Sequence, residues 1–288
     1  MGLERFIGEL AEQPQQADNS DYLDAEGLLM CGKCHTRKQC EIEIPGEDGT
    51  DIKRRVFCAC KCRQAEIEAE HKAQERYEFQ KRLEALRRDG ITDKAYLRHT
   101  FENDDRRSAS ISDVCRRYAD KWNEMKAENI GILFYGGVGT GKTFYACCIA
   151  NELINKLVSV GITNLPRILN RLQNGYQEER QQLIDGLQRY SLLVIDDLGV
   201  ERDSSYSVEQ VYNVIDTRSR SGKPLIITTN LSLKEMQNAQ SLAHQRIYDR
   251  VLELCPIRLA LTGSSRRIEN ASARRDKARE ILADGRVE

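Results

Sequence analysis

The chain has 288 residues, 40% hydrophobic and 31% charged, which suits one large domain or a standard domain with a smaller appendage. Its 44 basic and 45 acidic side chains nearly cancel, which excludes a uniformly basic surface of the kind that attracts nucleic acid. No apolar stretch approaches the roughly 18 residues of a membrane-spanning helix, and the N-terminus is acidic without an apolar run, so we expect a cytoplasmic protein with no signal peptide.

The first region, residues 1–62, is marked by cysteines. Six of the ten cysteines lie in it: Cys31, Cys34, Cys40, Cys58, Cys60 and Cys62. Clustered spacing of this kind, without a secretion signal, favours metal binding in a reducing compartment over disulfides. The CGKC pair and two cysteines of CACKC, joined by about 25 residues, suit tetrahedral Zn²⁺. Within CACKC the spacing leaves Cys58, Cys60 and Cys62 open, and Cys40 and His35 stand outside the pattern.

The next region, residues 63–99, is predicted to be a linker. Its first part, 63–90, contains no proline, has its only glycine at the end and is rich in Glu, Lys, Arg and Ala. This composition predicts one long, mostly exposed helix.

Basic residues close to the cysteines are candidates for contact with single-stranded DNA, since phosphate contacts need only surface cations: Lys53, Arg54, Arg55, Lys61 and Arg63.

From about Thr100, continuous apolar runs alternate with helical segments. The apolar runs are IGILFYG, SLLVIDDLGV and LIITTNLS, and helical segments such as FYACCIANELINKL and VEQVYNVIDTRSRSGKP separate them. This alternation predicts buried parallel strands in an α/β fold. After Ser232 the chain is predicted to be mainly helical, with one short apolar run, CPIRLALTG. We place this domain at residues 100–270 and a charged tail at 271–288.

A phosphate-binding loop lies at the start of this domain. Residues 136–143 read GGVGTGKT and fit G-x-x-x-x-G-K-[ST] between an apolar strand and a helix, the context the motif requires. Lys142 is expected to reach the β- and γ-phosphates, and the Thr143 hydroxyl to ligate Mg²⁺. The predicted nucleotide-binding residues are Gly136, Gly137, Val138, Gly139, Thr140, Gly141, Lys142, Thr143 and Phe144.

Polar side chains follow two further predicted strands. LLVIDDLG places Asp196 at the end of a buried strand, where it is expected to hold Mg²⁺. Asp197 is placed to orient or deprotonate an attacking water. LIITTN ends in Asn230, whose amide is expected to sense the γ-phosphate or position water.

These motifs occur in one order with characteristic spacings. FYGGVGTGKTFYACCIANELI, LLVIDDLGVER, KPLIITTNLS and RIYDRVLE together resemble the DnaC/DnaI-type helicase loaders of the AAA+ ATPases, a group that includes the IstB transposition helpers. Within it, the chain is most similar to DnaC-like replication proteins of phages and mobile elements. The resemblance covers residues from about 100 to 268 and the cysteine module. It implies an AAA+ P-loop domain with a five-stranded parallel sheet, helices on both faces and a small helical lid.

The resemblance also implies roles for individual residues. Asn230 matches the sensor-1 position, and Arg250 matches an arginine finger that reaches a neighbour's ATP, with Arg246 as the alternative. Arg267, or Arg266 in a shifted register, matches the sensor-2 region. Relatives commonly carry C-x-C before the charged helix, which favours Cys60 and Cys62 as zinc ligands beside Cys31 and Cys34. The region after Asn164 faces a central pore in relatives, so Arg167 and Arg171 are candidate DNA contacts.

The function that the resemblance implies is ATP-dependent loading of a hexameric replicative helicase onto single-stranded DNA. Slow, Mg²⁺-dependent ATP hydrolysis would act as an assembly switch, with self-association through ATP at subunit interfaces and helicase contact through the N-terminal half. The alternative is an IstB-like transposition helper that acts on duplex DNA with a transposase. The zinc module favours the loader, because transposition helpers more often begin with a plain helical region.

Overall fold

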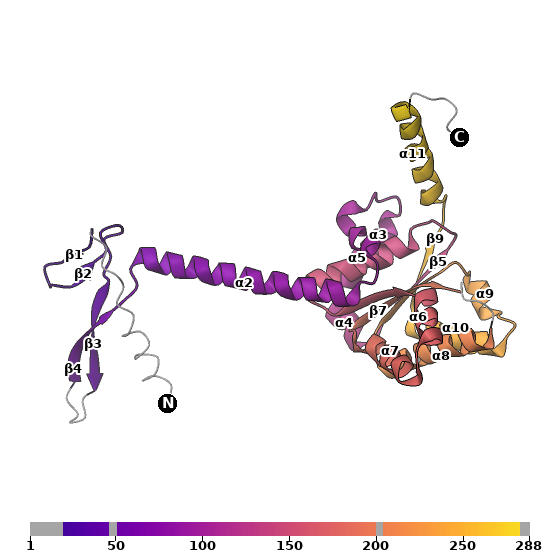
Figure 1. Cartoon of the computed structure of the whole chain (residues 1–288), viewed down its shortest axis with the longest axis horizontal. Helices are drawn as coiled ribbons and strands as arrows, with labels where there is room; N and C mark the ends of the chain where they lie inside the picture. Colours follow the sequence, from indigo (N-terminus) through magenta and orange to yellow (C-terminus); the bar gives the residue numbers. More distant parts are fainter. Residues whose placement is uncertain (1–19, 46–50, 200–203, 283–288) are drawn as a thin grey trace. The chain divides into compact units, whose positions relative to one another are not determined.

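A computed structural model describes residues 20–45, 51–199 and 204–282 (Figure 1). The chain divides into two compact units, Met1–Gln80 and Lys81–Glu288, which we call the N-terminal and C-terminal units. The division falls inside a long helix, α2 (Lys61–Gly90), which confirms the helix predicted for 63–90 and extends it by two residues. Its last ten residues thus belong to the C-terminal unit.

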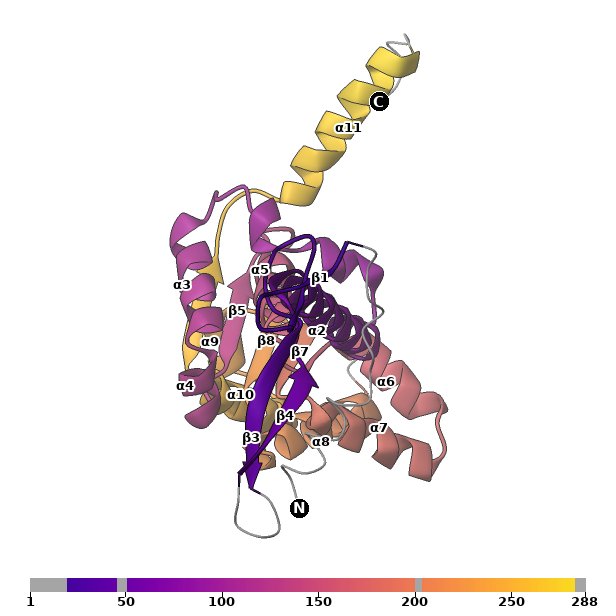
Figure 2. The ribbon, with the colours of Figure 1, turned by 90° about the vertical axis from the view of Figure 1, so that its left-hand side faces the viewer.

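The N-terminal unit is built from two small antiparallel ladders followed by the first part of α2. Strand β1 (Tyr22–Leu23) pairs with β2 (Leu29–Met30), and β3 (Gln39–Pro45) pairs with β4 (Asp51–Phe57) as a two-stranded ribbon that Figure 2 shows side by side. In this unit α2 is exposed almost throughout, as its charged composition predicted. The described part of the unit therefore has a small apolar core, which includes Leu28, Cys31 and Cys60.

The C-terminal unit contains the predicted five-stranded parallel sheet, in the order β6-β7-β8-β5-β9. The strands are β5 (Ile132–Gly136), β6 (Val160–Asn164), β7 (Leu192–Leu198), β8 (Leu225–Thr229) and β9 (Ile257–Leu261). Strands β5, β7 and β8 come from the three predicted apolar runs. Strand β6 is the segment that ends at Asn164. The fifth, β9, is the short run CPIRLALTG, which lies at one edge beside β5.

Helices cover both faces of this sheet, so neighbouring residues on a strand enter different cores. On β5, Ile132 and Phe134 enter one core and Leu133 the other. The first core includes residues of α3 (Ala109–Asp120), α4 (Trp122–Ala127) and α5 (Lys142–Asn155). The second includes residues of α6 (Leu165–Asn174), α7 (Gln177–Arg189), α8 (Ser205–Arg220), α9 (Leu233–Gln237) and α10 (Leu242–Leu254). Burial on both faces explains why the strands are continuous apolar runs.

The segment that follows α2 covers the β6 edge of the sheet. Ile91 forms a parallel bridge with Ile162, and the Thr92 hydroxyl donates to the Ile162 carbonyl at 3.0 Å. Gly90 passes so close that a Cβ there would lie 1.9 Å from the Val160 carbonyl oxygen. Two short 3₁₀ turns, η1 (Lys94–Arg98) and η2 (Phe101–Asn103), then lead to α3.

The last described element is α11 (Arg266–Leu282), a charged helix with no buried residue. It crosses residue 270, where the sequence placed the end of the ATPase domain. It is the one helix among the described residues after β9, and the implied helical lid stays a prediction. Across the described residues, no helix has the combination of length and apolar character that a bilayer crossing demands.

Candidate nucleotide site and cysteine cluster

The phosphate-binding loop connects β5 to α5, as the motif predicted. Gly136, Gly139 and Gly141 have φ angles of 132°, 78° and 104°, a backbone region in which a side chain is strained. At Gly136 a side chain is also excluded sterically, because a Cβ would lie 2.1 Å from the Leu261 carbonyl oxygen on β9. The glycines thus let the loop curl tightly beneath the N-terminus of α5, where backbone N–H groups can face an anion.

Lys142, the first residue of α5, is buried at the centre of the loop. Its ammonium donates to the carbonyl oxygens of Gly136 at 2.8 Å and Gly137 at 2.6 Å, and to Asn230 Oδ1 at 2.8 Å. Burial lowers the pKa of this amine, while the nearby charge of Asp197 opposes the shift. The lysine therefore links the loop to the end of β8, and its charge is held where phosphate oxygens would lie.

Asp196 is held by two hydroxyls at the end of β7. Thr143 Oγ1 donates to Asp196 Oδ1 at 2.7 Å, and Thr228 Oγ1 donates to the same oxygen at 2.5 Å. The carboxylate is buried, so these bonds replace solvent. A hydroxyl beside a carboxylate at this edge is the donor set that Mg²⁺ prefers, since the ion takes oxygen ligands. Sequence reasoning missed Thr228, because only the pairing of β7 with β8 brings it to Asp196.

Asp197 adopts an unusual backbone conformation, with φ of 60°. The ladder between β7 and β8 shifts register between Ile195 and Leu198, and the Asp197 N–H donates to Thr228 Oγ1 at 3.1 Å. The bulge turns the Asp197 side chain into the site rather than into the core. Burial raises the pKa of this carboxyl, the Asp196 charge adds to the shift, and Arg267 opposes it. A raised pKa brings a carboxylate closer to the range useful for a general base.

These residues surround a cavity of about 320 Å³. Of the predicted nucleotide and catalytic residues, it is lined by Val138, Gly139, Gly141, Lys142, Thr143, Phe144, Asp197, Asn230 and Arg267. Gly136, Gly137, Thr140 and Asp196 are not in its lining, although Thr140 Oγ1 donates to the Gly137 carbonyl and Asp196 holds Thr143.

The segment before α3 forms one wall of this cavity, which no sequence motif predicted. His99, Asn103, Asp105 and Arg107 line the same cavity. The His99 ring lies 5.5 Å from the Phe144 ring, and burial lowers the pKa of His99, which favours the neutral imidazole. A wall made of an imidazole and a phenyl ring is suited to a flat, uncharged group such as a nucleobase.

Two neighbouring arginines at the start of α11 line the cavity in different ways. The Arg266 N–H donates to the Gly139 carbonyl at 2.9 Å, and its guanidinium pairs with Asp105 at 3.2 Å. Arg267 is exposed, lines the cavity, and its charge acts on both Lys142 and Asp197. Arg266 therefore anchors the helix, while Arg267 is the arginine whose charge is open to a ligand.

Arg250 lies on α10, outside the residues that line the cavity. Its guanidinium donates to Glu253 at 2.7 Å and lies 3.6 Å from Asp216 Oδ1, and the side chain is 40% exposed. Arg246, one turn earlier, is exposed as well. Neither arginine can serve the nucleotide of its own chain from this position.

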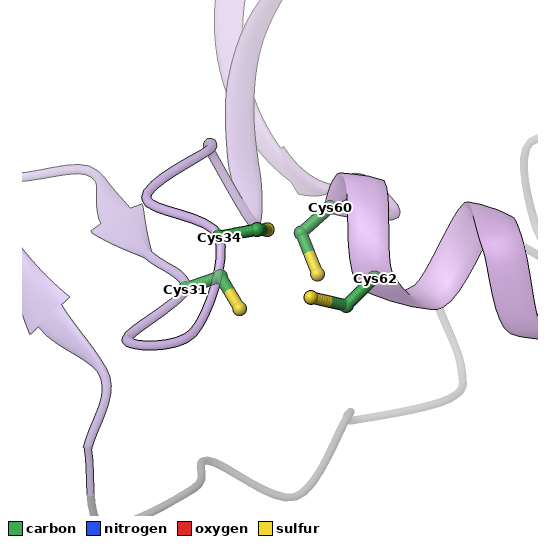
Figure 3. Close-up of side chains that lie close together, drawn as sticks. All are labelled: Cys31, Cys34, Cys60 and Cys62. Atoms are coloured by element: carbon green, nitrogen blue, oxygen red, sulfur yellow. The ribbon is translucent and has the colours of Figure 1, made fainter.

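Four of the six clustered cysteines meet at one point in the N-terminal unit. The sulfur atoms of Cys31, Cys34, Cys60 and Cys62 all lie within 4.8 Å of one another, and Figure 3 shows the two pairs turned toward each other. Thr36 joins the two halves, because its hydroxyl bonds Cys34 Sγ at 3.0 Å and accepts from the Lys61 N–H at 3.0 Å. The start of α2 thereby places Cys60, directly before the helix, and Cys62, in its first turn, opposite the CGKC loop.

This donor set fits a tetrahedral metal ion. Zn–S bonds of about 2.3 Å put the sulfur atoms of a tetrahedral site about 3.8 Å apart, a spacing compatible with the cluster. The hydrogen bond with Thr36 lowers the pKa of Cys34 to about 5, and the hydrogen bond between Cys34 and Cys62 raises the pKa of Cys62 to about 11.

The remaining candidates from the cysteine region lie outside this cluster. Cys58 Sγ is 3.6 Å from the Arg37 carbonyl oxygen, and Cys40 sits on β3. His35 Nδ1 instead shares a hydrogen bond with the Tyr22 hydroxyl at 3.1 Å. The structure therefore brings together one of the three sets of four that the spacing allowed, the set with Cys60 and Cys62.

A second, larger cavity of about 1280 Å³ runs along β6, α6 and α7. Arg167, Arg171 and Arg189 line it, together with several amide side chains. Arg167 is already engaged, because it donates to the Thr92 carbonyl at 3.2 Å. Arg171 is exposed in the last turn of α6 and forms no side-chain hydrogen bond or ion pair with the described residues, so its charge is available to a ligand.

Comparison with known proteins finds relatives of this chain. The model of the IstB-like ATP binding protein family matches residues 66–274. The replicative helicase loader DnaC of Escherichia coli (strain K12) is 31% identical over 139 residues, 47% of this chain and 54% of that protein. The replicative helicase loader DnaI of Bacillus subtilis (strain 168) is 27% identical over 203 residues, 65% of this chain and 64% of that protein. The match thus spans about half the length of DnaC.

The fold is also found among solved structures. A crystal structure from Streptococcus pyogenes serotype M3, described as a candidate primosome component, superposes with a TM-score of 0.50 and 22% identity over 63% of this chain and 97% of that one. At this identity the likeness concerns the fold alone.

Proposed function

The chain belongs to the family of IstB-like ATP-binding proteins, and from this premise we propose that it is an ATP-dependent loader of a replicative DNA helicase onto single-stranded DNA. The observation that supports the proposal is a phosphate-binding loop beside the polar ends of β7 and β8, in a chain similar to the loaders DnaC and DnaI. Lys142 donates to Asn230 at 2.8 Å, and Thr143 donates to Asp196 at 2.7 Å.

Each residue of the site has a separate task in ATP hydrolysis. Lys142 would release the carbonyls of the loop and bind phosphate oxygens, because a doubly charged partner outcompetes neutral acceptors. Thr143 and Asp196 would hold Mg²⁺, which screens the phosphate charge. Asp197 would orient or deprotonate the attacking water, and Asn230 would hold the γ-phosphate in line.

Hydrolysis should weaken as the pH falls through the raised pKa of Asp197, since the base must be ionised.

A structural zinc ion would be held in the N-terminal unit by the four thiolates of Cys31, Cys34, Cys60 and Cys62. A zinc ion so bound supplies the cohesion that a small apolar core cannot. We assign helicase contact to this unit, and the presence of the module favours a loader over a transposition helper.

The cavity along β6 is the place where we expect single-stranded DNA to lie. Arg171→Ala should weaken binding of a single-stranded oligonucleotide severalfold and lower the salt slope of log K by about 0.7, because one phosphate contact is lost. Fluorescence anisotropy at several salt concentrations measures both quantities. Arg117→Ala, on α3 and outside this cavity, is the matched control. An Arg171→Ala protein with the affinity and slope of the parent would remove this assignment.

Self-association would let Arg250 act on the nucleotide of a neighbouring copy. Arg250→Ala is expected to keep ATP binding and to lower the hydrolysis rate by about 100-fold or more, since a guanidinium in trans stabilises charge in the transition state. Mixing Arg250→Ala with Lys142→Ala should restore part of the activity, because one chain supplies the site and the other the arginine. Arg246→Ala tests the alternative finger. Full hydrolysis by Arg250→Ala alone would contradict the role.

The loader function itself is tested by co-elution of the purified protein with the host's replicative helicase, with ATP and single-stranded DNA present. A complex that forms with ATP and loosens on hydrolysis is the expected result. Assembly on duplex DNA without helicase binding would contradict the loader and point to the transposition helper.

A further inference from the structure

The hairpin of β3 and β4 in the N-terminal unit has two chemically different faces. In an antiparallel pair, directly opposed residues project to the same side. Glu41 lies opposite Arg55, and Glu43 lies opposite Lys53. Both pairs form salt bridges, at 3.0 Å and 3.7 Å, so this face is electrostatically compensated.

The compensated face is turned toward the rest of the unit. Arg55 donates to the carbonyl oxygens of Gly27 at 3.2 Å and Glu26 at 3.3 Å. Gln39, on the same face, accepts from the Leu29 N–H at 3.1 Å. These bonds connect the hairpin to the β1–β2 ladder and leave its other face pointing away from them.

The other face is apolar apart from one cation. Its residues are the opposed pairs Cys40–Val56, Ile42–Arg54 and Ile44–Ile52. Ile52 is 58% exposed, and Arg54 is exposed without an ion pair to any described residue. Cys40, Ile42, Ile44 and Val56 are half-buried, and among the described residues the ladder has no third strand. We define these six residues as the outer face.

The alternation of the strand separates the basic run that the sequence presented as one patch. Lys53 and Arg55 are paired with carboxylates, and of the three neighbouring cations only Arg54 lies on the outer face. Arg63, on α2, is engaged by Glu66 at 3.1 Å and Glu70 at 3.4 Å. A single cation among aliphatic side chains makes a poor track for a phosphate backbone, which requires several.

We propose that the outer face is a docking surface for a protein segment with aliphatic side chains around one carboxylate, and that the helicase supplies this segment. The aliphatic residues provide the apolar area, and a carboxylate would compensate Arg54 as contact excludes water. This inference rests on the proposed loader function, because the loader's helicase is the partner named.

The test uses the full-length protein and the purified host helicase. Ile52→Asp and Arg54→Glu should each weaken the helicase complex by about 30-fold or more, as for residues at the centre of an interface. Lys53→Glu is the control, since it alters the neighbouring residue on the opposite face. Zinc content and circular dichroism check that each variant keeps its fold, which is expected because both substituted side chains are exposed.

The possible outcomes separate the two proposals. If the parent binds the helicase and both outer-face variants bind equally well, the docking surface is wrong while the loader function stands. If the parent forms no complex with the helicase, both are wrong. If the variants lose only affinity for single-stranded DNA, or only self-association in sedimentation, the occupant is nucleic acid or a second copy, and the proposal is overturned.

Discussion

Nucleotide affinity is expected to fall by roughly 30- to 4,000-fold in a Lys142→Ala protein, and hydrolysis should become undetectable. The ammonium of Lys142 is buried and directed at the loop by three acceptors, two carbonyls and Asn230. Removing one partner of a buried, hydrogen-bonded charge pair costs about 2–5 kcal/mol, and each 1.4 kcal/mol is about tenfold in affinity. Titration with a fluorescent ATP analogue measures the change.

Lys156→Ala is the matched control for this experiment. Lys156 follows the last turn of the same helix and contacts Asp120 at 2.9 Å and the Ala119 carbonyl oxygen at 3.1 Å, far along the chain from the loop. Nucleotide binding by this variant should match the parent. If Lys142→Ala bound ATP as well as Lys156→Ala does, the cavity of about 320 Å³ would not be the nucleotide site.

Metal removal is expected to unfold the N-terminal unit and to leave the C-terminal unit intact. A structural zinc ion in a small site contributes about 10–16 kcal/mol of apparent binding free energy, which becomes folding free energy when the site forms only on folding. In the described part of this unit, Leu28 is the one buried apolar residue besides Cys31 and Cys60. A strong chelator should therefore release about one zinc per chain and expose residues before α2 to protease, while ATP binding persists.

Two serine substitutions within CACKC test whether Cys60 or Cys58 is a zinc ligand. Cys60→Ser should lower the zinc content well below one per chain, because Cys60 belongs to the cluster of sulfur atoms within 4.8 Å. Cys58→Ser should retain zinc, since Cys58 lies outside that cluster. Zinc measured by plasma mass spectrometry decides between them, and the reverse pattern would show that Cys58 is the ligand.

The sequence by itself determined those parts of the protein that depend on neighbouring residues. The loop GGVGTGKT requires glycine conformations and a strand–helix context that lie within about twenty residues, so its place was predicted correctly. Buried parallel strands are apolar on both faces, so their runs were visible before any contact was known. Helix α2 was also predicted from the sequence, because a long charged segment of helix-favouring residues without proline favours a helix over other secondary structure.

Tertiary structure decided what depends on which strands and loops become neighbours. Thr228 reaches Asp196 only because β7 pairs with β8, and His99 faces Phe144 only because the segment after α2 folds back over α5. Likewise, the choice of Cys60 over Cys58 follows from where α2 begins. On the hairpin, the pairing register separates Arg54 from the compensated Lys53 and Arg55. Each of these contacts joins groups whose meeting is set by packing and strand register, which local sequence patterns do not encode.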